Sequence, residues 1–281
     1  MSRKQDKNAL KNNVCAEVML ALVLKKRIWR WASLGLLCFG YLLLQTCSGD
    51  QTKAWNVPHI AQVAIEGPIQ SVSQDWYQQL LKVESSKTAT GLVLVVNSPG
   101  GVVHVAEAGY KLLMRIRNKG IPIVTVVKAQ ATSAAYLLAV TSHSIIANNT
   151  SIVGSIGVKS SVTVFKELLG NIGVNVNKIG VGEGLTQIPF QGISAFTKKY
   201  LDMSGEDSYI WFKRIVQQGR RLSDIELDAV VGGRVFTGKS SKQLRLIDHI
   251  GGIDDAYAMV KQHPANRLVM AQVVDYSTVM Q

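Results

Sequence analysis

From residue 59 onward, short apolar runs alternate with longer stretches whose apolar residues recur at helical spacing. The continuous apolar run 90–97 is typical of a strand covered on both faces, whereas 103–118 places Leu112, Leu113 and Ile116 on one side of a helix. Such alternation predicts βαβ units and an α/β domain with a mostly parallel core sheet. The pattern predicts strands over 59–66, 90–97, 121–127, 144–147 and 174–181, a weak strand from 268, and helices over 74–85, 103–118, 131–141, 162–169, 194–218 and 223–230.

The segment 31–48 holds eighteen uncharged, mostly apolar residues. As a helix it would rise about 27 Å, enough to cross a slightly thinned bilayer core. A cleaved signal peptide would end in small residues, and a lipoprotein site at Cys47 would require small residues in place of Gln45 and Thr46. We therefore expect an uncleaved anchor at 31–48, after a basic segment 1–30 and before a linker 49–59, a folded domain 60–262 and a tail 263–281.

Half of the net charge of +12 lies at the N-terminus, where residues 1–30 carry eight Lys and Arg against two acids. Positive charge on this side of the anchor predicts a cytoplasmic N-terminus and places the rest of the chain outside, at an inner or plasma membrane. The remaining chain has no basic stripe interleaved with aromatic residues, so nucleic-acid binding is not expected. Cys15, Cys38 and Cys47 all precede residue 49, so the exported domain must fold without disulfides.

Two glycine- and serine-containing turns follow successive buried strands. Gly100 and Gly101 lie between a strand and a helix, where backbone N–H groups can approach a ligand and form an oxyanion hole. Ser133 follows the next strand, and Ser155 lies in a further turn at 153–158. Ser133 could be a nucleophile or merely a helix N-cap. Because carboxyl ends of parallel strands share one sheet edge, Gly101 and Ser133 should lie close together.

Neither a histidine triad nor a metal site is indicated. None of the five His lies in a triad context, and Asp, Glu, His and Cys show no metal-ligand spacing. We therefore expect no metal and no cofactor.

Six stretches, in matching order, resemble the SppA-type signal peptide peptidases, membrane-anchored serine proteases of the ClpP/crotonase-like superfamily in their short, single-repeat form. The resemblance implies Ser133 as nucleophile, Gly100 and Gly101 as oxyanion residues and Ser155 as a contact of the general base. It also implies peptide substrates and a homo-oligomeric ring. The stretches are VVNSPGG (95–101), ATSAAYLLA (131–139), IVGSIGV (152–158), QGRRLS (218–223), GRVFTGKSSKQLRLID (233–248) and IGGIDDA (250–256).

The general-base lysine of that family is missing from its expected position, which is occupied here by Gly184 or, shifted by one, Leu185. Without a base, a serine hydroxyl is a poor nucleophile. The substitute candidates are Lys178, Lys198 and Lys199, used within the chain or across a subunit interface.

Three further departures from the family pattern concern residues near these motifs. Ala134 and Ala135 follow the serine where two glycines are usual, His143 stands in place of an Asp, and Arg245 stands in place of a Gly.

Three functions remain open at this point. The first is a membrane-anchored Ser-Lys endopeptidase that degrades signal peptides or other extended apolar peptides outside the cytoplasm. The second is a catalytically impaired relative that binds peptides or serves as an assembly subunit. The third, an acyl-CoA enzyme of the crotonase type, is disfavoured by the expected export, because acyl-CoA is cytosolic.

Overall fold

The computed structural model describes residues 25, 57–177, 188–266 and 271–277. The predicted anchor 31–48 and most of the predicted linker lie outside these residues. Within the described part of the chain, no helix combines the length and the apolar character needed to cross a bilayer.

The described strands form one sheet in the order β6-β5-β3-β2-β1-β8, with β4 paired to both β3 and β7. All neighbours are parallel except β5 and β6, which confirms the predicted parallel core. The strands are β1 (His59–Glu66), β2 (Ala89–Ser98), β3 (Ile123–Thr132), β4 (Ser144–Ala147), β5 (Ile152–Gly154), β6 (Val235–Thr237), β7 (His249–Ile250) and β8 (Gln272–Asp275).

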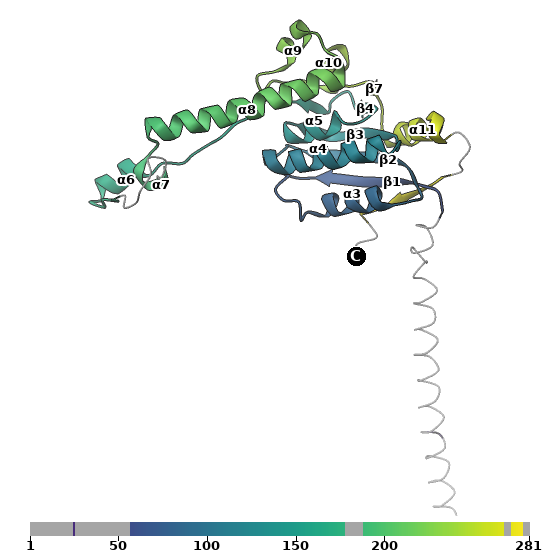
Figure 1. The fold of residues 1–281 in the computed structure, drawn as a ribbon, viewed down its shortest axis with the longest axis horizontal. Helices are drawn as coiled ribbons and strands as arrows, with labels where there is room; N and C mark the ends of the chain where they lie inside the picture. Colours follow the sequence, from purple (N-terminus) through teal and green to yellow (C-terminus); the bar gives the residue numbers. More distant parts are fainter. Residues whose placement is uncertain (1–24, 26–56, 178–187, 267–270, 278–281) are drawn as a thin grey trace, which may run out of the picture. The chain divides into compact units, whose positions relative to one another are not determined.

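Helices cover the sheet on both faces. Leu92, Leu94 and Val96 of β2 pack in the larger core with α3 (Asp75–Ser85), α4 (Val103–Asn118) and α5 (Ala134–Ala139), which lie side by side in Figure 1. The alternate residues Val93 and Val95 face a second core built on α11 (Ile253–Gln262). This two-sided burial is the physical reason for the continuous apolar run.

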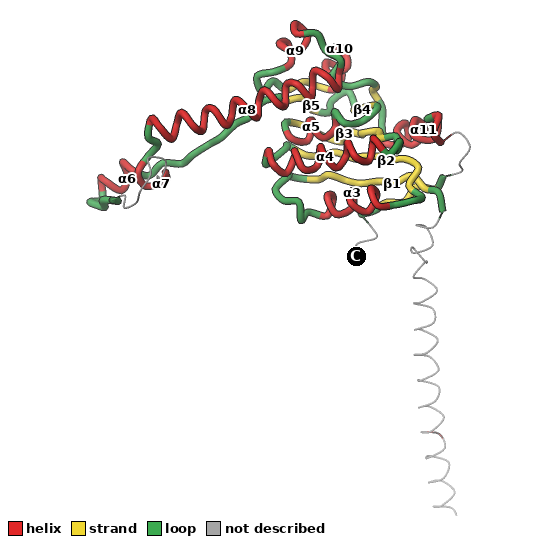
Figure 2. The backbone as a smooth tube through the Cα atoms, in the orientation of Figure 1, coloured by secondary structure: helices red, strands yellow, loops and turns green. Residues whose placement is uncertain are grey.

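The long helix α8 (Ala195–Arg220) has two different halves. Its C-terminal half buries Phe212, Ile215 and Val216 on the domain. Its N-terminal half, together with α6 (Lys166–Asn171) and α7 (Ile188–Gln191), forms a segment that we call the arm, residues 162–210 without the undescribed 178–187; Figure 2 shows α6 and α7 near the N-terminal end of α8. The arm exposes Val162, Val164, Phe165, Leu168, Ile172, Val174, Phe190, Ile193, Phe196, Tyr200, Leu201, Met203 and Ile210.

Three sequence predictions are wrong in part. The helix predicted over 162–169 begins only at Lys166 and ends at Asn171. Residues 174–177 form no strand, and 178–181 lie outside the described residues. The helix predicted over 131–141 begins only at Ala134, because β3 continues to Thr132 and pairs there with Gly154 of β5. The short elements β5, β6, β7, α10 (Gly238–Gln243) and the 3-10 turn Pro264–Asn266 were not predicted, whereas α9 (Asp224–Val230) matches its predicted range within one residue.

Candidate active site

Ser133 occupies a strained turn between β3 and α5. Its backbone has φ 53° and ψ −124°, a region that residues with a Cβ rarely adopt. The Ser133 N–H donates to the Gly154 carbonyl at 2.8 Å, which holds the turn against β5. The Ser133 side chain makes no capping hydrogen bond, so the N-cap interpretation is wrong. Strain of this kind persists where the surrounding structure requires it, often at functional sites.

The glycine turn packs directly against Ser133. A Cβ added to Gly100, whose φ is +96°, would lie 2.8 Å from the Ser133 Cβ and 2.9 Å from the Ala134 nitrogen. The strand-like bridge from Ile69 fixes the loop, since the Ile69 N–H donates to the Gly100 carbonyl at 2.9 Å and the Val102 N–H donates to the Ile69 carbonyl at 2.8 Å. The two strand ends therefore meet at one sheet edge, as expected.

The two glycine amides differ in their availability. The Gly100 N–H donates to the buried Ser98 Oγ at 3.1 Å. The N–H groups of Gly101 and Ala134 have no acceptor among the described residues. They are the free donors beside Ser133. The Ala134 amide was missed from the sequence, where attention fell on the glycines alone.

Ser155 lies next to Ser133 across the sheet. Thr132 of β3 is in register with Gly154 of β5, so the two serines follow at neighbouring positions. Ser155 also has a left-handed backbone, with φ 52°, and its N–H donates to the Arg234 carbonyl at 2.6 Å. The structure thus brings together Ser133, Ser155, Gly100 and Gly101.

A small, mostly apolar cavity of about 20 Å³ adjoins Ser133. Three helices and the turn after β5 contribute to it, and α8 supplies Ser208, Trp211 and Phe212 at positions i, i+3 and i+4. That spacing marks one helix face, but nothing in the sequence ties it to a serine far away in the chain. The remaining lining residues are Gly101, Val103, Ala106, Ser133, Ala134, Leu137, Gly157 and Val158.

The two described candidate bases, Lys198 and Lys199, are not brought to Ser133 within one chain. Lys198 is exposed and its Nζ lies 2.6 Å from Asp202 on the same helix. At 1.5 Å per residue, Lys198 and Lys199 lie about 15 Å along α8 from Ser208, which lines the cavity. Lys178, Gly184 and Leu185 lie outside the described residues. No described residue makes a hydrogen bond to the Ser133 Oγ.

His143 lies at the opposite end of β3. Its Nδ1 accepts a hydrogen bond from the Ile123 N–H at 3.0 Å. Burial, with Arg117 and His263 nearby, lowers the pKa of His143. Among the residues that the structure describes, no cluster of three or more His, Cys, Asp or Glu could hold a metal ion.

The family model "Peptidase family S49" matches residues 115–266, more than half of the chain, and the model "Clp protease" matches residues 57–153.

Three relatives match over most of this chain. A Methanocaldococcus jannaschii protein named as a protease is 29% identical over 79% of this chain and 76% of its own length. Protease 4 of Haemophilus influenzae is 28% identical over 76% of this chain and 36% of its own. An Enterococcus faecium protein named as a signal peptide peptidase, SppA, is 29% identical over 72% of this chain and 59% of its own. The match therefore spans between about a third and three quarters of the length of these relatives.

Proposed function

The chain belongs to peptidase family S49 and is a protease, and from that premise we propose that it is a serine endopeptidase whose nucleophile is Ser133. The observation that carries this proposal is the left-handed turn that holds Ser133 between Gly101, Ser155 and an apolar cavity. The substrates would be extended apolar peptides, including signal peptides, cleaved outside the cytoplasm.

The reaction would proceed through an acyl-enzyme. The Ser133 Oγ attacks the carbonyl carbon of the scissile peptide bond while a base takes the hydroxyl proton. The N–H groups of Gly101 and Ala134 donate to the oxyanion of the tetrahedral intermediate. The base returns the proton to the departing amine, and water then hydrolyses the ester. The sequence predicts that the N–H groups of both Gly100 and Gly101 bind the oxyanion. We assign this role to Gly101 alone, because the Gly100 N–H already donates to the Ser98 Oγ.

The cavity beside Ser133 suits a small apolar side chain of the substrate. It is bounded by Val103, Leu137 and Trp211 and offers only about 20 Å³. A bulky side chain would have to displace one of these residues, at a cost of about 1–3 kcal/mol. We therefore expect cleavage after small residues within apolar sequences.

A second copy of the chain would supply the base. The Ser155 hydroxyl, next to Ser133, would position this base by a hydrogen bond. Lys198 and Lys199 lie too far along α8 to reach Ser133 of their own chain. The arm exposes a large apolar surface, and such surfaces mark interaction sites. A homo-oligomeric ring in which the arm of one copy reaches the Ser133 edge of the next would cover this surface. Either Lys178 or one of the α8 lysines would then act across the interface.

Membrane attachment is part of the same proposal. The uncharged segment 31–48 would cross the membrane once, with the basic N-terminus in the cytoplasm and the protease domain outside. Substrates released into the bilayer would then be close to the enzyme.

One observation favours a non-catalytic alternative. No described lysine or histidine contacts the Ser133 Oγ, and the family's lysine position is Gly184 or Leu185. A chain without a base would still bind apolar peptides in the cavity and assemble through the arm. This alternative predicts peptide binding without turnover.

The full chain in detergent, incubated with an apolar signal-sequence peptide, tests the proposal by mass spectrometry of the products. We expect cleavage by the wild type and by Ser85→Ala, an exposed serine at the end of α3, and a loss of at least a thousandfold in Ser133→Ala. Intact peptide with the folded wild type would overturn the endopeptidase proposal. Peptide binding that survives in that case would establish the alternative.

A further inference from the structure

A second cavity, of about 810 Å³, lies away from Ser133 at the amino ends of the parallel strands. It lies between the C-terminal parts of α4, α5 and α8 and the segment from α10 to β7, next to the start of β3. Its lining residues are Tyr110, Met114, Arg117, Val140, Thr141, Ser142, His143, Ile215, Gln218, Gly219, Arg220, Arg221, Lys242, Arg245, Ile247 and Asp248. The proposed protease mechanism uses none of these residues.

The charge of this cavity is strongly one-sided. Five cationic side chains line it, four from Arg and one from Lys, against the single carboxylate of Asp248. Clefts lined by one sign of charge concentrate ligands of the opposite sign. The cavity is therefore built to attract anions.

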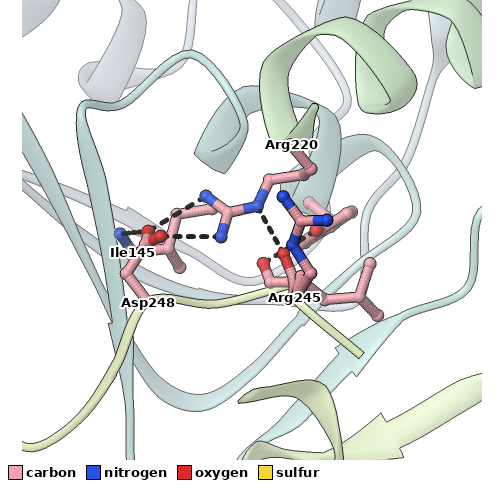
Figure 3. A network of polar contacts seen from close by, with 6 residues as sticks. Ile145, Arg220, Arg245 and Asp248 are labelled. Atoms are coloured by element: carbon pink, nitrogen blue, oxygen red, sulfur yellow. Dashed lines mark hydrogen bonds and ion pairs between the residues drawn. The ribbon is translucent and has the colours of Figure 1, made fainter. Parts of the chain in front are cut away.

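One arginine forms the fixed floor of the cavity. The Arg220 side chain is only 8% exposed, and its guanidinium donates to both Asp248 carboxylate oxygens at 2.8 and 2.9 Å. Its Nε donates to the Arg245 carbonyl at 2.8 Å, and Asp248 also accepts from the Ile145 N–H at 2.7 Å. Figure 3 shows Arg220 joining Asp248 on one side to Arg245 on the other. The charge of Arg220 is thus neutralised by Asp248, and its hydrogen bond to the Arg245 carbonyl fixes the backbone there.

Three of the four remaining cations are not paired with a carboxylate among the described residues, and Arg245 is the exception. Arg245 forms an ion pair with Glu226 at 2.9 Å. Within the described part of the chain, Arg117, Arg221 and Lys242 have no carboxylate partner; Arg117 donates only to the Thr141 carbonyl. Arg221 and Lys242 are exposed at the mouth of the cavity.

The backbone conformation of two arginines is a second, independent feature of this cavity. Four described residues other than glycine have a positive φ: Ser133 and Ser155 at the catalytic edge, and Arg221 (51°) and Arg245 (60°) at this cavity. Arg221 directly follows α8, and Arg245 follows one residue after the last turn of α10, positions at which glycine usually adopts this conformation without strain. Two helix ends thus carry arginines in a strained conformation, and both arginines line one cavity.

We propose that this cavity binds a small molecule through a phosphate group, with Arg221 and Lys242 as its principal contacts. A phosphate dianion offers three oxygens and two charges, which one guanidinium and one ammonium can share. A single carboxylate would leave much of the charge uncompensated. The apolar residues Val140, Ile215 and Ile247 line the same space and would contact the organic part of the ligand.

Isothermal titration of the full chain in detergent with inorganic pyrophosphate tests this proposal. The test variant is Arg221→Gly with Lys242→Ala, since glycine fits the left-handed backbone and the protein keeps its fold. The matched control is Arg214→Ala with Lys239→Ala, which removes one exposed arginine from α8 and one exposed lysine from α10 outside the cavity. Both double variants lower the net charge equally.

We expect saturable binding by the wild type, a Kd at least tenfold weaker in the test variant and a change of less than twofold in the control. Equal weakening in both variants would reduce the effect to overall charge and overturn the proposal. Absence of binding, or equally tight binding of succinate, would overturn it as well. Glycerol 3-phosphate and dihexanoyl phosphatidylglycerol then distinguish a soluble phosphate ester from a lipid headgroup, and saturable binding of either supports the proposal.

Discussion

Residues other than glycine adopt a positive φ near both ends of strand β3, but the side chains around the two ends differ in chemistry. At its carboxyl end, Ser133 adopts a positive φ among glycines and apolar side chains. At its amino end, Arg221 and Arg245 adopt a positive φ around a cavity lined by five cations. A residue with a Cβ in this conformation costs about 1–2 kcal/mol relative to glycine. Under the two proposals made above, Ser133 would need its side chain as the nucleophile and Arg221 would need its charge to bind the ligand, which would account for the strain at each site.

Two helices connect the two sites. Both α4 and α8 contribute residues to the cavity beside Ser133 and to the cavity lined by five cations, which we call the basic cavity. Tyr110 lines the basic cavity and Trp211 the catalytic one, and their rings meet edge to face with centroids 5.9 Å apart. The two sites are therefore separate in chemistry and adjacent in packing.

The largest loss of stability and activity is expected from a substitution that crowds the turn at Gly100, next to Ser133. In Gly100→Ala the new Cβ would lie 2.7 Å from the Thr132 carbonyl oxygen, at a φ of +96°. Strain and overlap together should lower the free energy of unfolding by about 2–4 kcal/mol and abolish cleavage. Urea unfolding measures the first effect and a peptide assay the second.

The control for that variant is Gly120→Ala, whose φ is +82° with nothing within 4 Å of the added Cβ. It carries the backbone strain alone, so we expect a loss of about 1 kcal/mol and unchanged cleavage. If the two variants lost equal stability, the close packing of the Gly100 turn against Ser133 would be disproved.

Ser155→Ala should slow cleavage about 10- to 100-fold while leaving the fold intact. The hydroxyl next to Ser133 would orient the base, and loss of a positioning hydrogen bond costs about 1.5–3 kcal/mol when the partner is charged. The ratio kcat/KM against pH checks this role, because a change in the pKa of the base should also shift the acidic limb, on which the base loses its proton. An unchanged rate and profile would remove Ser155 from the mechanism.

Ser133→Gly should raise the free energy of unfolding by about 1 kcal/mol relative to Ser133→Ala, since only glycine relieves the left-handed backbone. Both variants should be equally inactive. Thermal unfolding measures the stability of the two variants, and a peptide-cleavage assay on the same samples measures their activity. A less stable glycine variant would mean that Ser133 is not strained.

Arg245→Gly is the corresponding change at the opposite edge. Relief of the positive φ should contribute about 1 kcal/mol, and loss of the exposed, solvent-screened ion pair with Glu226 should offset only part of that gain. We expect unchanged or slightly higher stability and undiminished cleavage in the same two assays. A clear loss of stability would show that the Arg245 side chain, and not only its carbonyl, maintains the fold.

The smallest effect concerns the pH dependence of the ion pair between Glu226 and Arg245. The Ser223 backbone N–H, together with hydrogen bonds from Arg245 and the Ser223 hydroxyl, lowers the pKa of Glu226 from 4.5 to about 2. Because the folded pKa is depressed, this stabilisation is complete above about pH 4.5 and is lost as the pH falls toward 2. Unfolding of wild type and Glu226→Gln should therefore converge at low pH. Parallel pH profiles would contradict this.

Much of the fold could be predicted because its strands are buried on both faces. The apolar run 90–97 and the amphipathic stretch 103–118 carry that information locally, and β2 and α4 match them closely. By contrast, β5 has three residues and β7 two, too few for any period to appear. Their pairing depends on strands distant in sequence, so local patterns could not identify them.

The candidate site could be predicted only in part for the same reason. Gly101, Ser133 and Ser155 each lie in a turn that follows a strand, and parallel topology brings the carboxyl ends of such strands together. Trp211 and the Ala134 amide contribute to the site through tertiary packing and backbone geometry. The spacing of residues along the sequence does not show that either of them lies beside Ser133. The basic cavity was missed because Arg117, Arg221 and Lys242 come from three elements, although His143 and Arg245, which the sequence marked as unusual, both line it.

Covalent labelling of the full chain with a fluorophosphonate probe, followed by peptide mapping, tests the central claim most directly. A strained serine beside free amides and supplied with a base should form one adduct, on Ser133, which is lost in Ser133→Ala and retained in Arg221→Gly. Absence of any adduct on the folded, assembled protein, or an adduct on another serine, would contradict the assignment of Ser133 as the activated nucleophile.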